Sequence, residues 1–292
     1  MYDLPVIATS VAAYRFLARE LATIVRLSWA ALFIVAVIQY LVARGVLAEM
    51  ASALADGDLM AAAASGHDPL WLTLKFGADI IGTAIVAVAI HQLILFDDRK
   101  EGRYVHIAFG IREALFLLLG TVLGAVVVLF ATNVVSPFGE AKTGSAPFFA
   151  WLAFIIAIYL SIRLWPVLPM IVVAGRLDFP AAWRLTRHRF WSLLALVLLG
   201  SIPLGLMALA IDSALPSFDS LMDAISGPRQ GMPSAAAAAA AVARAQDWLL
   251  LRVLLDFAAS VVATAVTVAL ISFSYLVLTG RPLDRPLPQT QR

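Results

Sequence analysis

Two pairs of opposite charges stand four residues apart in otherwise apolar segments, and this spacing suits ion pairing. Lys75 precedes Asp79, and Arg252 precedes Asp256. Residues four apart share one face of a helix, so each pair predicts a local ion pair at the end of a membrane span, where charged side chains reach water. The alternative is one network of all four charges, which would lock two helices together or line an outward-facing vestibule.

Arg163 is a further charge within an apolar segment, and its chemistry suits a phosphate. The apolar run 164–174 follows it. Pro166 and Pro169 leave backbone carbonyls free and favour a kink, which could give room for an Arg-bound lipid phosphate. The alternative is an arginine at the inner membrane boundary, with 166–174 lying along the surface.

No motif for catalysis or metal binding accompanies these charges. The sequence has no cysteine, which excludes disulfides, thiol nucleophiles and cysteine-bound metals. Its four histidines lie in unrelated segments without metal-ligand spacing. It contains no phosphate-binding glycine loop, no HExxH and no GxSxG. We therefore expect no catalytic residue, no metal and no cofactor.

Membrane-spanning helices are the elements that must position these charges. Hydrophobic residues make up 62% of the chain and charged residues only 14%, whereas soluble domains contain roughly 25% charged residues. A span needs about 20 apolar residues. Six runs are long enough, at 22–43, 70–96, 113–134, 147–174, 190–212 and 247–278. The sequence predicts an all-α polytopic membrane protein of about six helices, with one domain over 1–280 and a disordered tail at 281–292.

The connections between these runs differ in charge and complexity. Fifteen of the 21 lysines and arginines lie in four groups: Arg15–Arg26 near the start, Arg99–Arg112 in the second connection, Arg163–Arg189 around the fourth connection, and Arg281–Arg292 in the tail. Because positive loops stay in the cytoplasm, both termini are predicted to be cytoplasmic, in a bacterial inner membrane. The alanine-rich segments 44–69 and 213–246 become outer loops. Within the second, Ser234 is expected to cap a helix that runs through the alanines into the last span.

Two cytoplasmic segments have the pattern of interfacial amphipathic helices. On a helical wheel of 9–26, Arg15 and Arg19 form one stripe with Arg26. A second helix is expected to begin at Phe179-Pro180, and it places Arg184 and Arg187 among tryptophans. Such helices bind anionic headgroups. The alternative is a positive cluster that only sets orientation. Flanking spans argue against nucleic acid as a partner.

Short matches along the chain suggest an internal repeat. Ala12-Ala13-Tyr14-Arg15 resembles 181–184, and the outer ends of the second and sixth runs both carry a tryptophan followed by one of the two charge pairs. Each repeat unit would hold one cytoplasmic surface helix and one transmembrane hairpin, all in the same orientation. The predicted units are 9–100, 101–176 and 177–280.

One segment also carries a family resemblance. Its residues, in order, are Tyr159, Arg163, Pro166 and Pro169, then a short basic turn, then Trp183, Thr186, Phe190 and Trp191. This order resembles the membrane domain found with some bacterial glycerophosphoryl diester phosphodiesterases, and the related YciC-like inner-membrane proteins, over about residues 10–280. The resemblance implies a six-helix module linked to envelope or lipid biology. In that family the activity belongs to a separate barrel domain with no counterpart in this sequence, so no catalytic residue carries over.

Together these patterns predict a non-enzymatic membrane module that binds anionic lipids or organises the envelope. Its candidate headgroup contacts are Arg15, Arg19, Arg163, Arg184 and Arg187. A small-solute transporter or channel is an alternative, with a sparse set of polar residues for its path: Arg163, His91, Gln92, Thr264, Thr267 and Ser272. A scaffold for partner membrane proteins is another, because Gly120 and Gly124 permit close helix packing.

Overall fold

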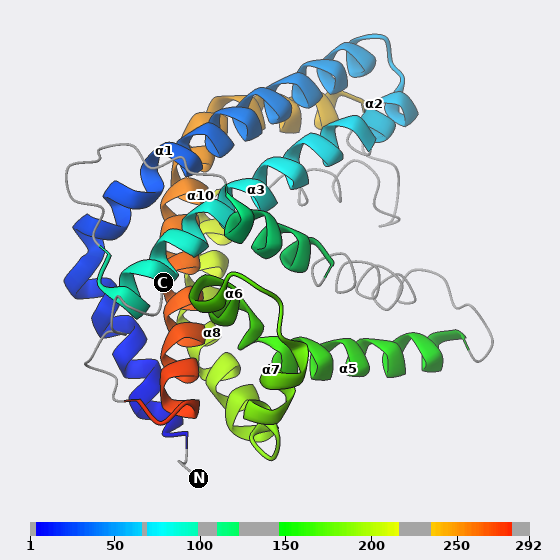
Figure 1. The fold of residues 1–292 in the computed structure, drawn as a ribbon. Helices are drawn as coiled ribbons and strands as arrows, with labels where there is room; N and C mark the ends of the chain where they lie inside the picture. Colours follow the sequence, from blue (N-terminus) through cyan, green and yellow to red (C-terminus); the bar gives the residue numbers. More distant parts are fainter. Residues whose placement is uncertain (1–3, 66–68, 99–109, 123–145, 216–234, 282–292) are drawn as a thin grey trace. The chain divides into compact units, whose positions relative to one another are not determined.

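The structure of the protein is a computed structural model that describes residues 4–65, 69–98, 110–122, 146–215 and 235–281 (Figure 1). Within these residues every regular element is a helix. The helices are α1 (Val6–Ala55), α2 (Leu59–Ser65), α3 (Pro69–Phe96), α5 (Ala146–Leu164), α6 (Val167–Ala174), α7 (Phe179–Thr186), α8 (Phe190–Ala214) and α10 (Ala235–Leu278). Residues 111–122 are helical as well. The predicted all-α class is confirmed.

Five helical segments of the described chain are long and apolar enough to cross a membrane: Val6–Ala55, Thr73–Phe96, Phe154–Ala174, Phe190–Ala214 and Ala236–Leu278. The chain is therefore a polytopic membrane protein. The predicted span 113–134 lies partly outside the described residues, as does the tail 282–292, so a sixth span stays a prediction. At 1.5 Å per residue, the 50 residues of α1 extend about 75 Å. This is more than twice the hydrocarbon thickness of about 30 Å, so part of α1 stands outside the hydrocarbon.

The prediction of an outer loop over 44–69 is wrong. Helix α1 continues to Ala55, and α2 follows after a turn at Gly57, where φ is 78°. The carboxylate of Asp58 caps α2 by accepting a hydrogen bond from the Ala61 amide at 2.9 Å. Alanine has the highest helix propensity, which explains why this low-complexity segment is helical. The predicted helix through the second alanine run is confirmed, because α10 begins at Ala235.

The predicted interruption of the fourth span is confirmed. Helix α5 ends at Leu164, and α6 begins at Val167. Pro166 has no amide proton, and its ring disfavours a continuous helix through the preceding turn. Helix α6 then ends at Gly175, which has the left-handed conformation typical of helix ends, with φ of 66°.

The chain folds into two compact units. Helices α1, α3, α8 and α10 each begin in one unit and end in the other. The first unit comprises Met1–Ser28, Ala84–Ser201 and Thr264–Arg292. Within it, every residue of α3 from Ala84 to Phe96 is buried except Gln92. The C-terminal part of α10 is buried in the same unit, including Leu270 and Phe273. These two segments form the centre of the first unit.

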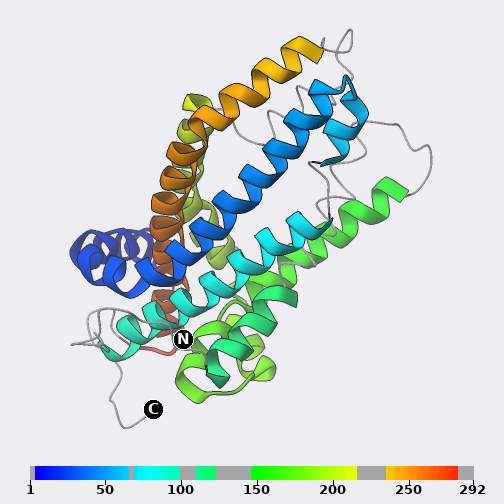
Figure 2. The ribbon, with the colours of Figure 1, turned by 90° about the horizontal axis from the view of Figure 1, so that it is seen from above.

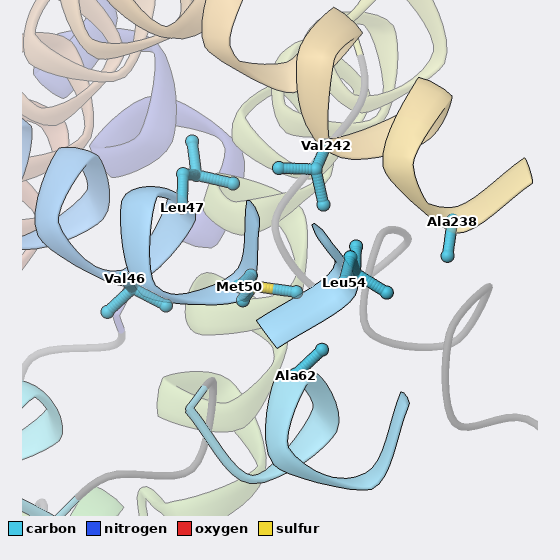
Figure 3. Close-up of a cluster of buried hydrophobic side chains, with 7 residues drawn as sticks. All are labelled: Val46, Leu47, Met50, Leu54, Ala62, Ala238 and Val242. Carbon is cyan, nitrogen blue, oxygen red and sulfur yellow. The ribbon is translucent and has the colours of Figure 1, made fainter. Parts of the chain in front are cut away.

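The second unit comprises Trp29–Thr83 and Ile202–Ala263. Within it, the C-terminal part of α1 and the N-terminal part of α10 run side by side in opposite directions (Figure 2). A cluster of buried apolar side chains joins them to α2 (Figure 3). We call this the alanine cluster, and its members are Val46, Leu47, Met50, Leu54, Ala62, Ala238 and Val242. The side chain of Gln246 adds a hydrogen bond to the Leu47 carbonyl, at 3.4 Å.

Candidate functional site

The charge pair on α10 forms in the structure, within the second unit. Arg252 Nε lies 2.9 Å from an Asp256 carboxylate oxygen, as the spacing predicts. Its Nη2 donates to Asp212 of α8 at 2.6 Å, a contact that joins two helices and that the sequence does not predict. The third nitrogen, Nη1, is buried and has no hydrogen-bond partner in the described part of the chain. Arg252 therefore holds two carboxylates, and these belong to α8 and α10.

The second predicted pair has a different arrangement in the same unit. Asp79 on α3 accepts a hydrogen bond from the Gln39 side chain on α1, at 2.5 Å. Lys75 lies one helical turn from Asp79, close enough to act on it electrostatically. Arg252 contacts Asp256 and Asp212, and Asp79 contacts Gln39. The proposed network of all four charges stays a prediction.

We expect Arg252→Gln to destabilise the protein, because it leaves Asp212 and Asp256 without their shared cation. Both carboxylates are partly exposed, at 49% and 40%, so water screens their repulsion. The expected loss in unfolding free energy is about 1–2 kcal/mol. Thermal unfolding in detergent, followed by tryptophan fluorescence, measures it. Arg244→Gln is the control, because Arg244 is exposed on the same helix. Equal midpoints for the two variants would contradict the role of Arg252.

A buried polar pair joins α3 to α10 at the centre of the first unit. His91 is fully buried, and its Nδ1 lies 2.7 Å from Ser272 Oγ. The Ser272 hydroxyl donates to the Val268 carbonyl at 2.8 Å, so His91 Nδ1 must be the donor in the contact between them. The ring packs at 5.7 Å from the ring of Phe116, and Nε2 has no hydrogen-bond partner in the described structure. This pair brings together two of the polar residues considered for a transport path, whereas Thr267 is exposed.

An aromatic and basic surface lies on α7 and the start of α8, both in the first unit. Helix α7 begins as predicted, with Asp178 accepting from the Ala181 amide at 2.9 Å and Pro180 in its first turn. It ends before His188, whose φ of 67° breaks the helix ahead of α8. Three aromatic side chains remain exposed, Phe179, Trp183 and Trp191. Arg184 and Arg187 are exposed beside them in the sequence. We call these five residues the α7 surface.

The N-terminal part of α1 has three distinct faces within the same unit. One face is buried and includes Thr9, Ala13, Ile24 and Leu27. A second is apolar but exposed, with Ile7, Val11, Leu21 and Val25. The third carries Arg15 and Arg19, which are exposed, and Arg26, which is half-buried. The exposed faces provide the apolar and basic stripes that an interfacial helix requires, and the buried face packs on the protein.

Arg163 lies half-buried in the last turn of α5, which contacts α7 (Figure 1). Its Nε donates to the Tyr159 hydroxyl at 3.1 Å, and its Nη1 lies 3.5 Å from Thr186 Oγ1. Its guanidinium carbon is 4.8 Å from the centre of the Trp183 ring and 5.3 Å from that of Tyr159. The structure thus brings Arg163 to the α7 surface, which the sequence could not establish.

Comparisons with models of protein families, with curated proteins and with solved structures find no match to this chain. The family resemblance and the functional alternatives therefore remain predictions. The contacts, exposure and charge of the chain's own residues are the basis on which a function can be proposed.

Proposed function

We propose that this protein is a non-enzymatic module of the bacterial inner membrane that binds anionic lipid headgroups at the cytoplasmic face. The main support is the α7 surface. Trp191 is 77% exposed, and Phe179 and Trp183 are each 40% exposed. Tryptophan side chains favour the headgroup region of a bilayer, and arginines beside them attract anionic lipid. The surface combines both features in one short segment.

The N-terminal part of α1 supports the same function. Its exposed apolar face can enter the boundary between headgroups and acyl chains, while Arg15 and Arg19 remain at the level of the phosphates. Ser28 stands where α1 leaves the first unit, and its hydroxyl donates to the Ile24 carbonyl at 2.8 Å. Such back-bonding favours a helix bend. A bend there would let the segment before it lie in the membrane plane.

The proposed orientation, with both termini in the cytoplasm, rests on the distribution of positive charge. Arg15, Arg19, Arg184 and Arg187 all belong to segments on the positively charged side of the predicted topology. The cytoplasmic leaflet is also where anionic lipids give the membrane its negative surface potential. The orientation and the proposed ligand therefore agree with each other.

Neutralising the α7 surface is expected to weaken the preference for anionic lipid. An arginine near an anionic surface contributes about 1 kcal/mol, so Arg184→Gln with Arg187→Gln should reduce the preference by about thirtyfold. Tryptophan quenching by brominated phosphatidylglycerol, relative to brominated phosphatidylcholine, measures this in reconstituted vesicles. Adding Arg15→Gln and Arg19→Gln should lower the preference further.

The matched control is Arg44→Gln with Arg244→Gln, which removes the same charge from exposed positions of the second unit. This pair is expected to retain the preference of the unaltered protein. If the two double variants lost it equally, net charge alone would explain binding. If neither lost it, the α7 surface would have no role in lipid binding.

A further inference from the structure

The α7 surface includes an arginine whose guanidinium is held in place before any ligand arrives. Tyr159 and Thr186 accept from Arg163 Nε and Nη1. Thr186 is itself fully buried and fixed, because its Oγ1 lies 2.9 Å from the Ala182 carbonyl and 3.2 Å from the Arg163 carbonyl. These contacts tie the end of α5 to the end of α7 and restrict the side chain of Arg163.

Two aromatic rings lie close to the same guanidinium. Trp183 and Tyr159 both lie within cation–π distance of it. The two rings meet edge to face, with centres 6.1 Å apart. Phe190 supports Tyr159 from α8, with ring centres 5.0 Å apart. Arg163 therefore loses little conformational freedom when it binds a ligand, which favours affinity.

One nitrogen of the guanidinium, Nη2, remains available. Nη2 makes no hydrogen bond in the described part of the chain, and it is not among the buried nitrogens that lack one. It therefore reaches the molecular surface, beside the exposed ring of Trp183. Its N–H groups can donate charge-assisted hydrogen bonds to the oxygens of an anion.

We propose that the free Nη2 nitrogen of Arg163 is a binding site for a single phosphate group. The proposal rests on the proposed lipid-binding function and identifies the group that is bound. Exposed tryptophans lie at the headgroup level, and the anionic group found at that level is the phosphodiester of a phospholipid. Arg184 and Arg187 add positive charge in the neighbouring sequence and favour the anion. A lipid phosphate and free phosphate share this chemistry, and the experiment separates them.

The test uses a protein in which Trp183 is the only tryptophan, the others being replaced by phenylalanine. In mixed micelles it is titrated with brominated phosphatidylglycerol and with a brominated diacylglycerol hemisuccinate. Both lipids carry one negative charge, but only the first has a phosphate. The phosphate is attached directly to the glycerol, whereas the succinate carboxylate stands farther out at the end of a succinyl chain. We therefore expect only phosphatidylglycerol to reach Arg163 at the headgroup level and to quench Trp183 at about tenfold lower concentration, the factor that one charge-assisted hydrogen bond supplies. Equal quenching by the two lipids would overturn the proposal.

Substitution of Arg163 provides the second arm. Arg163→Gln should abolish the tenfold preference. Arg163→Lys keeps the positive charge, which controls for misfolding caused by loss of the charge, and it should retain only part of the preference. Arg176→Gln is the matched control, because Arg176 precedes α7 and its side chain is 76% exposed. It should keep the full preference. A preference that survives in Arg163→Gln would overturn the site.

Inorganic phosphate distinguishes the source of the ligand. If millimolar phosphate, but not sulfate at equal ionic strength, relieves quenching by phosphatidylglycerol, the site accepts free phosphate. If it does not, the site requires phosphate carried by a lipid, and either result supports a phosphate site. If Arg184→Gln with Arg187→Gln weakens both lipids equally while Arg163→Gln changes neither, the proposed function stands and the Arg163 site is rejected.

Discussion

Met50→Ala is expected to lower the free energy of unfolding by about 2–5 kcal/mol, the range typical of truncating a fully buried methionine, leucine or isoleucine. Met50 has no exposed surface, and it is the largest unbranched side chain of the alanine cluster (Figure 3). The cluster also contains Ala62 and Ala238, which have no side-chain rotamers with which to fill the space. The substitution therefore leaves a cavity between α1, α2 and α10.

The control for this prediction is Met60→Ala. Met60 lies on α2, in the same unit, and is 80% exposed. The same atoms are removed there without a cavity, so the expected change is within about 0.5 kcal/mol. Denaturant unfolding in detergent, followed by circular dichroism, measures both variants. Similar losses at Met50 and Met60 would mean that the alanine cluster does not stabilise the second unit.

The membrane spans could be predicted because the bilayer imposes a length on apolar sequence. A run as long and as apolar as 190–212 is typical of a transmembrane helix, and α8 occupies Phe190–Ala214. The interruption at Pro166 was equally predictable, since proline acts locally on the chain. These features depend only on neighbouring residues, which a single sequence contains in full.

The helical structure of residues 44–55 and 59–65 is not predicted, because the low complexity of this segment suggests a loop. A helical signal was present in the sequence. Val46, Met50 and Leu54 are spaced four residues apart, which places them on one face of a helix, and all three are buried. Alanine between them has strong helix propensity. An apolar stripe within an alanine-rich segment was therefore the better guide than its composition.

The partners of the candidate site residues could not be predicted, because they lie far away in the sequence. The spacing of Arg252 and Asp256 predicts their contact, but nothing local identifies Asp212, which is 40 residues away. Arg163 likewise meets Thr186 across a break between helices, 23 residues on. Helical periodicity gives the face on which a residue lies, but it does not give the helix that packs against that face.

Gly200→Leu is expected to destabilise the protein by about 0.5–3.5 kcal/mol, because the centre of the first unit has little space for a side chain there. A Cβ atom at Gly200 would overlap Leu270 Cδ1 and lie 3.3 Å from its Cδ2. Leu270 is buried on α10, so its side chain would have to shift within the core. The Tyr14 hydroxyl also donates to the Gly200 carbonyl at 2.6 Å, which ties the N-terminal part of α1 to α8. Overpacking costs about 1–3 kcal/mol, and loss of the hydrogen bond adds about 0.5–1.5 kcal/mol. The higher helix propensity of leucine offsets about 1 kcal/mol of this loss.

Gly205→Leu on the same helix separates this packing effect from the effect of removing a glycine. A Cβ atom at Gly205 meets nothing within 4 Å, and the residue is exposed. Because glycine disfavours a helix by about 1 kcal/mol relative to alanine, this variant should be neutral or slightly more stable. The two variants are thus expected to shift the thermal midpoint in opposite directions or by very different amounts. Equal shifts would mean that the contacts of Gly200 with Leu270 and Tyr14 do not hold α1, α8 and α10 together in the first unit.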